Sequence, residues 1–473
     1  MAHDTAVSAP NGRELRSGVL GTAAIVFLVT SAAAPMAAIA GSGSLAMLLG
    51  NGAGAAGAYV LAALCLLVFS VGYTAMARHV SEAGGFFSFT LRAGGMVPAG
   101  ATAYLAFFGY NALQIGIYGL FGAACEMLFA AEAGLSLPWW VYSALALPVV
   151  GALGYRQIDV SAKVLGVLVL LEFIVVCTLD AVIVGKGGPA GSFTFAPLAP
   201  QTVLGGSLSI ALLFAFSTFV GFEATTIYSE EAKDPETTIP RATYISVLLI
   251  GGFYAFTALC MIVGGGVDRV GEVLGAMKDP TDLLFVLGYD YLGENFTRLM
   301  RVLFVTSVFA SLLAFHNNVG RYALVLARHR LLPETLNRTH PVHQSPHLGS
   351  LLQSVIGAVV LLAFVVAGAH PILALFSWLI NTGTLAIVTA MIITSFSIAI
   401  FFRSLADARE NRPTTVVLPC LAGTVLAIIG GLAAMHFDIL VGVEGTLAVA
   451  LPALVLLTAA LGALVGWLRT RQS

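Results

Sequence analysis

The feature that most constrains the fold is a series of apolar runs, each long enough to cross a lipid bilayer. A spanning helix needs about 20 mainly apolar residues. On that template the chain contains about twelve spans, near residues 18–48, 55–77, 98–130, 139–155, 160–185, 204–230, 240–265, 296–327, 348–368, 371–402, 414–435 and 444–468. Only 10% of the 473 residues are charged, whereas soluble domains carry about 25%. The sequence therefore predicts an all-α integral membrane protein.

Lysine and arginine are distributed unevenly between alternate loops. If the N-terminal tail is cytoplasmic, 17 of the 22 basic residues lie on the cytoplasmic side and 5 on the outside. Cytoplasmic loops of membrane proteins carry this excess of positive charge. We therefore predict a multi-pass protein of the cell membrane, with both tails, residues 1–17 and 469–473, in the cytoplasm.

Several other classes of protein lack support in the sequence. The five cysteines lie at irregular spacing in apolar runs and form no CxxC pair, so neither a disulfide framework nor a metal site is predicted. No basic cluster indicates nucleic acid. The chain contains no HExxH, no GxSxG and no phosphate-binding GxxxxGK[ST] motif. We predict no enzyme, no ATP-driven pump and no cofactor.

Two of the predicted spans are interrupted. In the first, Pro35 removes a helix hydrogen bond; in the sixth, Ser217, Thr218 and Gly221 precede the carboxylate of Glu223. Within a bilayer an unpaired backbone group costs several kcal/mol, so such breaks are tolerated only where they line a cavity or are buried. A simple kinked helix is the alternative for the first span taken alone.

The positions of the two breaks predict the organisation of the chain. They lie five spans apart, and breaks at corresponding places in two halves indicate an inverted repeat with a ligand site near the bilayer midplane. We predict a five-plus-five inverted repeat, residues 18–185 and 204–402, with helices 1 and 6 broken. Two peripheral helices, residues 414–468, would follow, for packing or for contacts within a homodimer. A monomer is the alternative.

The sixth span and its following loop carry a family resemblance. Residues 221–241 read GFEATTIYSEEAKDPETTIPR. This stretch resembles the sixth helix and loop of the amino acid–polyamine–organocation permeases, in which Gly-Phe-Glu precedes an acidic loop and an Ile-Pro-Arg. A second match follows the eighth span, at Arg321, Tyr322, Arg328, Leu332, Pro333, Ser345 and Pro346.

The resemblance implies a secondary transporter that works by alternating access. It would move a small amino acid or a related amine, with the substrate carboxylate on amides around Ser31–Met36 and the amine on carbonyls of the broken sixth helix. Phe216 and Phe219 are candidates for an aromatic lid. The predicted substrate-binding residues are Ser31, Ala33, Ala34, Pro35, Met36, Tyr110, Gln114, Phe216, Ser217, Thr218, Phe219, Gly221, Trp378 and Asn381. For Tyr110 and Gln114, helix–helix hydrogen bonding is the alternative.

Glu172 is the most informative departure from the family pattern. Many permeases of this family carry a lysine at this position, where other transporters of the fold bind sodium. A carboxylate at a helix centre costs about 2.5–3.5 kcal/mol on insertion scales and is functional by default. Glu172 could carry a proton, neutralise a cationic substrate or serve a structural role. Asp180, near the outer end of the same span, is expected to be solvated.

The remaining candidates concern coupling and gating. We favour a proton over sodium because Glu172 can titrate, while Ser307 and Ser311, one turn apart, keep a sodium site open. Glu223 is expected to pair with polar groups on the cytoplasmic side of the break.

His316 departs from the small-residue pattern of the family's eighth helix. With Pro35-Met36, it is closer to the putrescine-importer branch. Within the bilayer it is either a packing residue or a proton carrier. A polyamine or simple amine (putrescine-like) importer or exchanger, with Glu172 as counter-ion, is therefore the alternative function.

Overall fold

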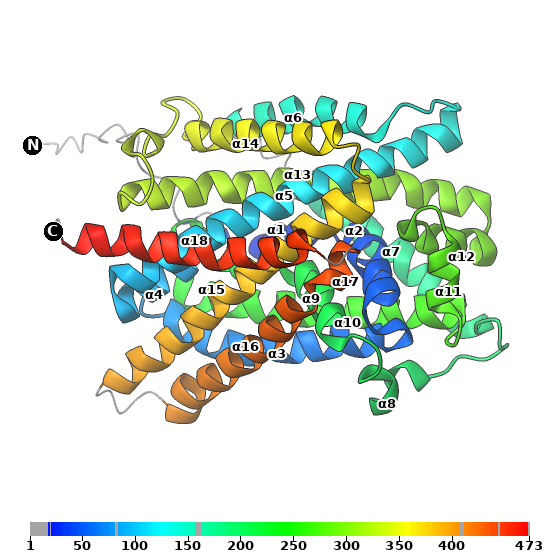
Figure 1. The fold of residues 1–473 in the computed structure, drawn as a ribbon, viewed down its shortest axis with the longest axis horizontal. Coiled ribbons are helices and arrows are strands. Elements are labelled where there is room, and N and C mark those ends of the chain that lie inside the picture. Colours follow the sequence, from blue (N-terminus) through cyan, green and yellow to red (C-terminus); the bar gives the residue numbers. More distant parts are fainter. Residues whose placement is uncertain are drawn as a thin grey trace, which may run out of the picture.

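The computed structural model describes residues 18, 20–80, 84–156, 162–405, 411–442 and 445–471. All regular elements in these ranges are helices (Figure 1). The longer ones are α1 (Thr22–Ala33), α3 (Ala55–Ala77), α5 (Met96–Ala133), α6 (Trp139–Arg156), α7 (Ala162–Lys186), α9 (Leu208–Phe219), α10 (Pro235–Gly265), α13 (Glu294–Arg328), α14 (His347–Val366), α15 (Ser377–Ser404), α16 (Leu418–Met435) and α18 (Thr446–Thr470).

Shorter helices connect or extend these. They are α2 (Pro35–Ala38), α4 (Phe86–Gly94), α8 (Pro200–Val203), α11 (Val270–Ala276), α12 (Leu283–Leu292) and α17 (Phe437–Val441). Tighter or wider helical turns complete the chain: η1 (Ile39–Gly43), η2 (Ala46–Asn51), η3 (Gly52–Gly54), η4 (Ala196–Leu198), η5 (Phe222–Glu231), η6 (Pro280–Asp282), η7 (Glu334–Leu336), η8 (Pro371–Phe376) and η9 (Pro413–Val417).

The prediction of an all-helical membrane protein is confirmed. Ten helical stretches in the described residues are long and apolar enough to cross a membrane. The first, Thr22–Ala77, contains the first two predicted spans, and α6 corresponds to the fourth. Together they account for the predicted spans. The division into repeats 18–185 and 204–402 stays a prediction.

Different short helices lie at the two ends of the helix bundle. In Figure 1 most of the long helices run roughly along the horizontal axis, and α15 and α16 cross it obliquely. Helix α4 and the C-terminal end of α18 lie at one end, and α8, α11 and α12 lie at the other. We call the end of the bundle that carries α4 the α4 end, and the opposite end the α11 end.

Helix α18 docks on α5 through small residues. Gly462 and Gly466 are four positions apart and face Gly100 and the backbone of Met96 so closely that a methyl group on any of the three glycines would overlap the facing main chain. Small residues at this spacing let membrane helices approach each other. The small residues of α18, the twelfth predicted span, therefore pack against α5 of the same chain. Leu457 and other leucines of α18 are exposed.

Both predicted helix breaks are present. Between α1 and α2, Ala34 adopts φ 43° and ψ 77°, a left-handed conformation that costs a non-glycine residue about 1–3 kcal/mol. Pro35 then starts α2 without an N–H to satisfy. Between α9 and η5, Gly221 adopts φ 118°, which favours glycine because it has no side chain.

A β-bridge joins the segments that flank the two broken helices at the α4 end. The Leu20 N–H donates to the Glu231 carbonyl at 2.9 Å, and the Lys233 N–H donates to the Leu20 carbonyl at 2.9 Å. Arg321 on α13 lies 3.3 Å from the Glu231 carboxylate and over the ring of Tyr228. The start of α1, the end of η5 and α13 are thus connected.

Candidate functional site

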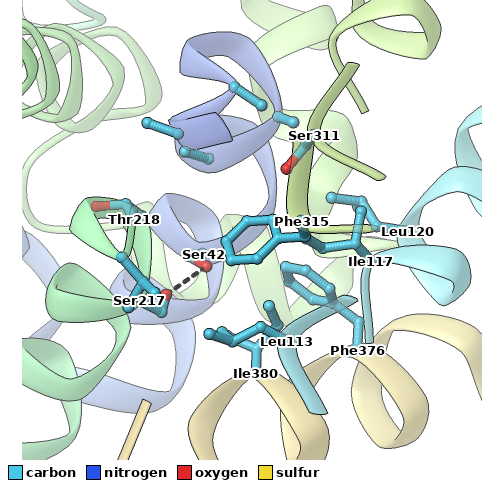
Figure 2. Close-up of a pocket in the computed structure, with 15 residues that line it drawn as sticks. Ser42, Leu113, Ile117, Leu120, Ser217, Thr218, Ser311, Phe315, Phe376 and Ile380 are labelled. Carbon is cyan, nitrogen blue, oxygen red and sulfur yellow. Dashed lines mark hydrogen bonds between the residues drawn. The ribbon is translucent and has the colours of Figure 1, made fainter. Parts of the chain in front are cut away.

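A cavity of about 40 Å³ lies between the two broken helices, with room for about three water molecules. One side is formed by α1, α2, η1 and the end of α9, and the other by α5, α13, η8 and α15. The Ser42 and Ser217 hydroxyls, one from each broken helix, lie 2.9 Å apart (Figure 2). The wall consists of Ala33, Ala34, Ala37, Ala38, Ser42, Leu113, Ile117, Leu120, Ser217, Thr218, Val220, Ser311, Phe315, Phe376 and Ile380.

Two aromatic side chains dominate the wall opposite the breaks. Phe315 extends from α13 and Phe376 from the end of η8 into the space beside Leu113 and Ile117 (Figure 2). Gly41 makes room for Phe376, since a Cβ there would lie 3.1 Å from its ring. These rings, and not Phe216 and Phe219, are the aromatic residues of the cavity.

The wall contains hydroxyls and helix ends but no ionisable side chain among the described residues. The C-termini of α1 and α9 carry partial negative charge, and the N-terminus of α2 carries partial positive charge. A zwitterion can be bound by such dipoles without a buried counter-ion. Within the ranges that the structure describes, no group of three or more His, Cys, Asp or Glu residues could hold a metal ion.

Five of the predicted site residues line this cavity. Ala33, Ala34, Ser217 and Thr218 come from the breaks, and Ser311 comes from α13. The Thr218 hydroxyl donates to the Ala215 carbonyl at 2.7 Å. The chain therefore places the two breaks side by side around one space, as their spacing in the sequence suggests.

Other predicted substrate contacts point elsewhere. The Ser31 hydroxyl donates to the Phe27 carbonyl within α1. Phe219 packs edge-on against Tyr254. Phe216, also predicted, is buried outside the wall.

The two predicted residues of the tenth span also lie outside the wall. Trp378 packs on Phe364 of α14. Asn381 donates to the Ser377 carbonyl within α15.

Glu172 lies directly at the first break, outside the cavity wall. Its side chain is 1% exposed. Its Oε2 atom accepts from the Ser307 hydroxyl at 2.6 Å and from the Met36 N–H at 3.3 Å. Glu172 therefore links α7, α2 and α13. The Met36 N–H, expected to meet a substrate carboxylate, is taken by Glu172 in this conformation, and Pro35 has no N–H to offer.

Glu223 closes the second break. Its Oε2 atom accepts from the Gly221 N–H at 2.9 Å, and its Oε1 atom accepts from the Tyr110 hydroxyl at 2.7 Å. The Tyr73 hydroxyl donates to its carbonyl at 3.1 Å. The carboxylate thus satisfies the backbone freed by the break and fixes α5 to it. Tyr110 supports the break and does not line the cavity.

Gln114 and His316 belong to a separate buried network between α5, α13 and α14. The His316 Nε2 atom lies 2.6 Å from the Ser350 hydroxyl, and its Nδ1 atom lies 3.2 Å from the Gln114 amide. The Gln353 amide donates to the Gln114 side-chain oxygen. Neither Gln114 nor His316 lines the cavity. The geometry corresponds to the packing alternative for both residues.

This network leads to a stability prediction. Replacing His316 with alanine removes two hydrogen bonds and leaves buried partners behind, which we expect to lower the free energy of unfolding by about 2 kcal/mol. The measurement is thermal unfolding of the purified protein in detergent. His436→Ala, at an exposed position, is the control. An unchanged midpoint for His316→Ala would contradict this reading of the network.

Asp180 corrects one expectation. It is 1% exposed and accepts a hydrogen bond from the Thr257 hydroxyl at 2.7 Å, so it is not solvated. Lys186, the last residue of α7, lies six positions after it, and the buried face of α7 extends past Asp180 to Ile183. Closeness to the end of a span was a poor guide to exposure here.

Most of the wall residues missing from the sequence prediction are apolar. Leu113, Ile117 and Leu120 follow one face of α5, and Ile380 lies on α15. Such spacing is the ordinary pattern of a packed helix face, so it carries no signal for a cavity. Ser42 is the exception, because it lies beside Gly41 and Gly43 in the broken first span and is polar.

Comparison with known proteins identifies the family. Residues 20–461 match the family model described as "Amino acid permease". The branched-chain amino acid permease BcaP of Bacillus subtilis is 25% identical over 81% of this chain and 83% of its own length. The low-affinity putrescine importer PlaP of Escherichia coli is 24% identical over 65% of this chain and 66% of its own length.

A solved structure has the same fold. A mutant of the manganese transporter of Eremococcus coleocola superposes with a TM-score of 0.60 over 99% of this chain and all of that chain, at 12% identity. At this identity the match bears on the fold alone. The family model spans nearly all of the described residues, including both breaks and the cavity. The chain therefore belongs to the amino acid permease family and is a membrane transporter of amino acids or amines.

Proposed function

We propose that the protein imports a small apolar amino acid by alternating access and that uptake is coupled to a proton. The cavity between the two broken helices is the substrate site. Glu172 is the coupling group, and the α4 end, which carries Arg403 and Arg469 at the ends of α15 and α18, faces the cytoplasm. The observation that carries this proposal is the position of Glu172 at the first break.

The composition of the wall supports an amino acid over a polyamine. A polyamine needs anions close by, because a buried unpaired cation is strongly unfavourable. Glu172 and Glu223 both lie outside the cavity wall, and they accept hydrogen bonds from other protein groups. The apolar side, with Leu113, Phe315 and Ile380, suits an aliphatic side chain. The resemblance to a branched-chain amino acid permease agrees with this choice.

The contacts of Glu172 suggest how a proton acts. An ionised carboxylate accepts hydrogen bonds only, whereas the protonated form also carries a donor. The ionised form is held by the Met36 N–H and the Ser307 hydroxyl and so ties α2 and α13 to α7. Protonation weakens these charge-assisted bonds. We propose that it frees α2, and its N-terminal amides, to move with the substrate.

The test is uptake by purified protein in liposomes. An inward proton gradient is imposed, and radiolabelled amino acids, diamines and polyamines are compared, with a sodium gradient in a parallel series. We expect a small apolar amino acid to accumulate with the proton gradient and not with sodium alone. Transport restricted to amines would overturn the substrate assignment, and dependence on sodium alone would overturn the coupling assignment.

The size of the cavity leads to a prediction of specificity. Ile380→Ala shortens a side chain of the wall and so enlarges the cavity. One methylene group in an apolar pocket changes the selectivity between substrates by about 10–200-fold. We expect the preference for larger over smaller aliphatic amino acids to rise at least about ten-fold. Competition between the two in the liposome assay measures it. Ile400→Ala, 62% exposed on the same helix, should leave the ratio unchanged. An unchanged ratio for Ile380→Ala would place the substrate elsewhere.

A further inference from the structure

Helix α7 contains a second buried carboxyl that the coupling scheme above does not use. Asp180 and Glu172 are each 1% exposed. They are eight residues apart, about 12 Å along the helix at 1.5 Å per residue, and they lie on the same side of α7. Val176, fully buried, lies between them. Asp180 is the member of the pair nearer the α11 end.

The surroundings of Asp180 provide few hydrogen-bond donors. The Thr257 hydroxyl donates to its Oδ2 atom at 2.7 Å, and the Cys260 thiol contacts its main-chain carbonyl at 3.9 Å. Its Oδ1 atom is buried and has no hydrogen-bond partner among the described residues. An ionised carboxylate has about four acceptor positions. The Thr257 hydroxyl and the weakly donating Cys260 thiol are the side-chain donors at this carboxyl. They satisfy it poorly as an anion, and an added proton would occupy the unpartnered oxygen.

The other ionisable groups around Asp180 offer no counter-ion within the described residues. The titratable groups near it are the Cys177 thiol on α7 and the Cys260 thiol on α10. Helices α1 and α2 carry no charged residue. The cation closest along the chain, Lys186, donates to the Tyr291 carbonyl.

Of the remaining helices packed against α7, α13 carries Arg321 and Arg328 toward the α4 end, and both α12 and α13 carry further charges at the α11 end. The charged residues at the α11 end are Asp290 on α12 and Glu294, Arg298 and Arg301 on α13. Arg298 and Arg301 pair with Glu132, and Arg301 also pairs with Glu294.

Helix α10 connects Asp180 to the break. Thr257, which binds Asp180, lies one turn after Tyr254 on the same helix. The Tyr254 hydroxyl donates to the Ala33 carbonyl at 2.9 Å, at the end of α1. Hydroxyls on successive turns of α10 therefore reach from Asp180 to the residues beside Glu172.

We propose that Asp180 is a second proton-binding site, loaded from the α11 end, which delivers protons toward Glu172. The carboxylate accepts a proton, becomes a neutral carboxylic acid, and releases the proton in the direction of the break. Proton binding by Asp180 stands on its own contacts. The delivery step rests on the proposed proton coupling. The competing explanation is that Asp180 only ties α7 to α10 through Thr257.

The first experiment measures proton binding directly. Infrared difference spectra of the full-length protein in lipid are recorded as the pH is raised, for Glu172→Gln and for the Glu172→Gln/Asp180→Asn double variant. We expect the single variant to show loss of a protonated carboxyl C=O band that the double variant lacks. Identical spectra from the two would mean that Asp180 does not exchange a proton, and the proposal would be wrong. This result does not depend on substrate or on transport.

The second experiment tests delivery. Asp180→Asn removes titration and keeps the helix contact, because the asparagine side chain retains an oxygen that can accept from Thr257. A gradient of one pH unit drives one-proton accumulation of about ten-fold. We expect Asp180→Asn to slow the approach to this ratio at least about ten-fold, as loss of a proton-transfer group does, with the final ratio and the melting temperature unchanged.

Thr257→Val is the matched control, because it removes the hydrogen bond and keeps the carboxyl. We expect it to slow uptake less than Asp180→Asn does, because the carboxyl that binds the proton is still present. Equal slowing and equal loss of melting temperature in both variants would assign Asp180 a structural role and overturn the proposal. If substrate accumulation by the wild-type protein did not depend on the proton gradient, the coupling proposal would be refuted instead. The infrared titration would still decide whether Asp180 binds a proton.

Discussion

Glu172→Gln protein is expected to exchange substrate at close to the wild-type rate and to accumulate none of it under an inward proton gradient. Glutamine is nearly isosteric, and its side-chain oxygen can still accept from Ser307 and the Met36 N–H, so the first break keeps its shape. It cannot bind a proton. Under a gradient of one pH unit, the wild-type ratio of inside to outside substrate should approach about ten for one coupled proton, and that of the variant should stay at one.

The measurement is accumulation and counterflow in the same liposomes. Glu272→Gln is the control, since Glu272 is an exposed glutamate on α11, and it should behave as the wild type does. Accumulation that survives Glu172→Gln would leave Glu172 with a structural role. Loss of substrate binding by Glu172→Gln, with only amines carried by the wild type, would instead make it the counter-ion of a cationic substrate.

Glu223→Ala protein is expected to lose most of its transport and much of its stability. The substitution leaves the Gly221 N–H and the Tyr110 hydroxyl buried without the acceptor they use now. A buried donor without a partner costs about 1–3 kcal/mol, so the free energy of unfolding should fall by about 3 kcal/mol. Thermal unfolding measures this loss, and exchange in liposomes, expected to fall at least about ten-fold, measures the effect on the break.

Two variants separate the contributions to this effect. Tyr110→Phe removes one of the two hydrogen bonds and should cost about 1 kcal/mol. Glu223→Gln keeps an acceptor for the Gly221 N–H and should retain measurable exchange. If Glu223→Ala were as stable and active as the wild type, the carboxylate would not be what satisfies the second break.

The sequence was sufficient for the fold because the bilayer restricts the alternatives. Apolar runs of spanning length must become helices, and Pro35 and Gly221 must interrupt them where protein or a cavity surrounds the backbone. The same reasoning placed Ala33, Ala34, Ser217 and Thr218 around one space. It also identified Glu172, since a carboxylate within a span is costly enough to stand out.

The rest of the site depends on contacts that no residue type encodes. Whether Phe216 or Phe315 faces the cavity depends on the rotation of α9 and α13, and both are phenylalanines in apolar helices. Gln114 was expected near the substrate, but it meets His316 because α13 and α14 pack behind α5. A polar side chain in a membrane helix indicates a partner, and the sequence does not say whether that partner is a ligand or another helix.

The bridge between Leu20 and the end of η5 has a consequence for the route out of the cavity. The segment before α1 and the segment at the end of η5 share two backbone hydrogen bonds at the α4 end, so the two segments are expected to move together. Each bond contributes only about 1 kcal/mol, which thermal motion can overcome. Deuterium exchange at the Leu20 and Lys233 amides would therefore report how often these two hydrogen bonds open at the α4 end. The measurement needs no substrate, label or gradient.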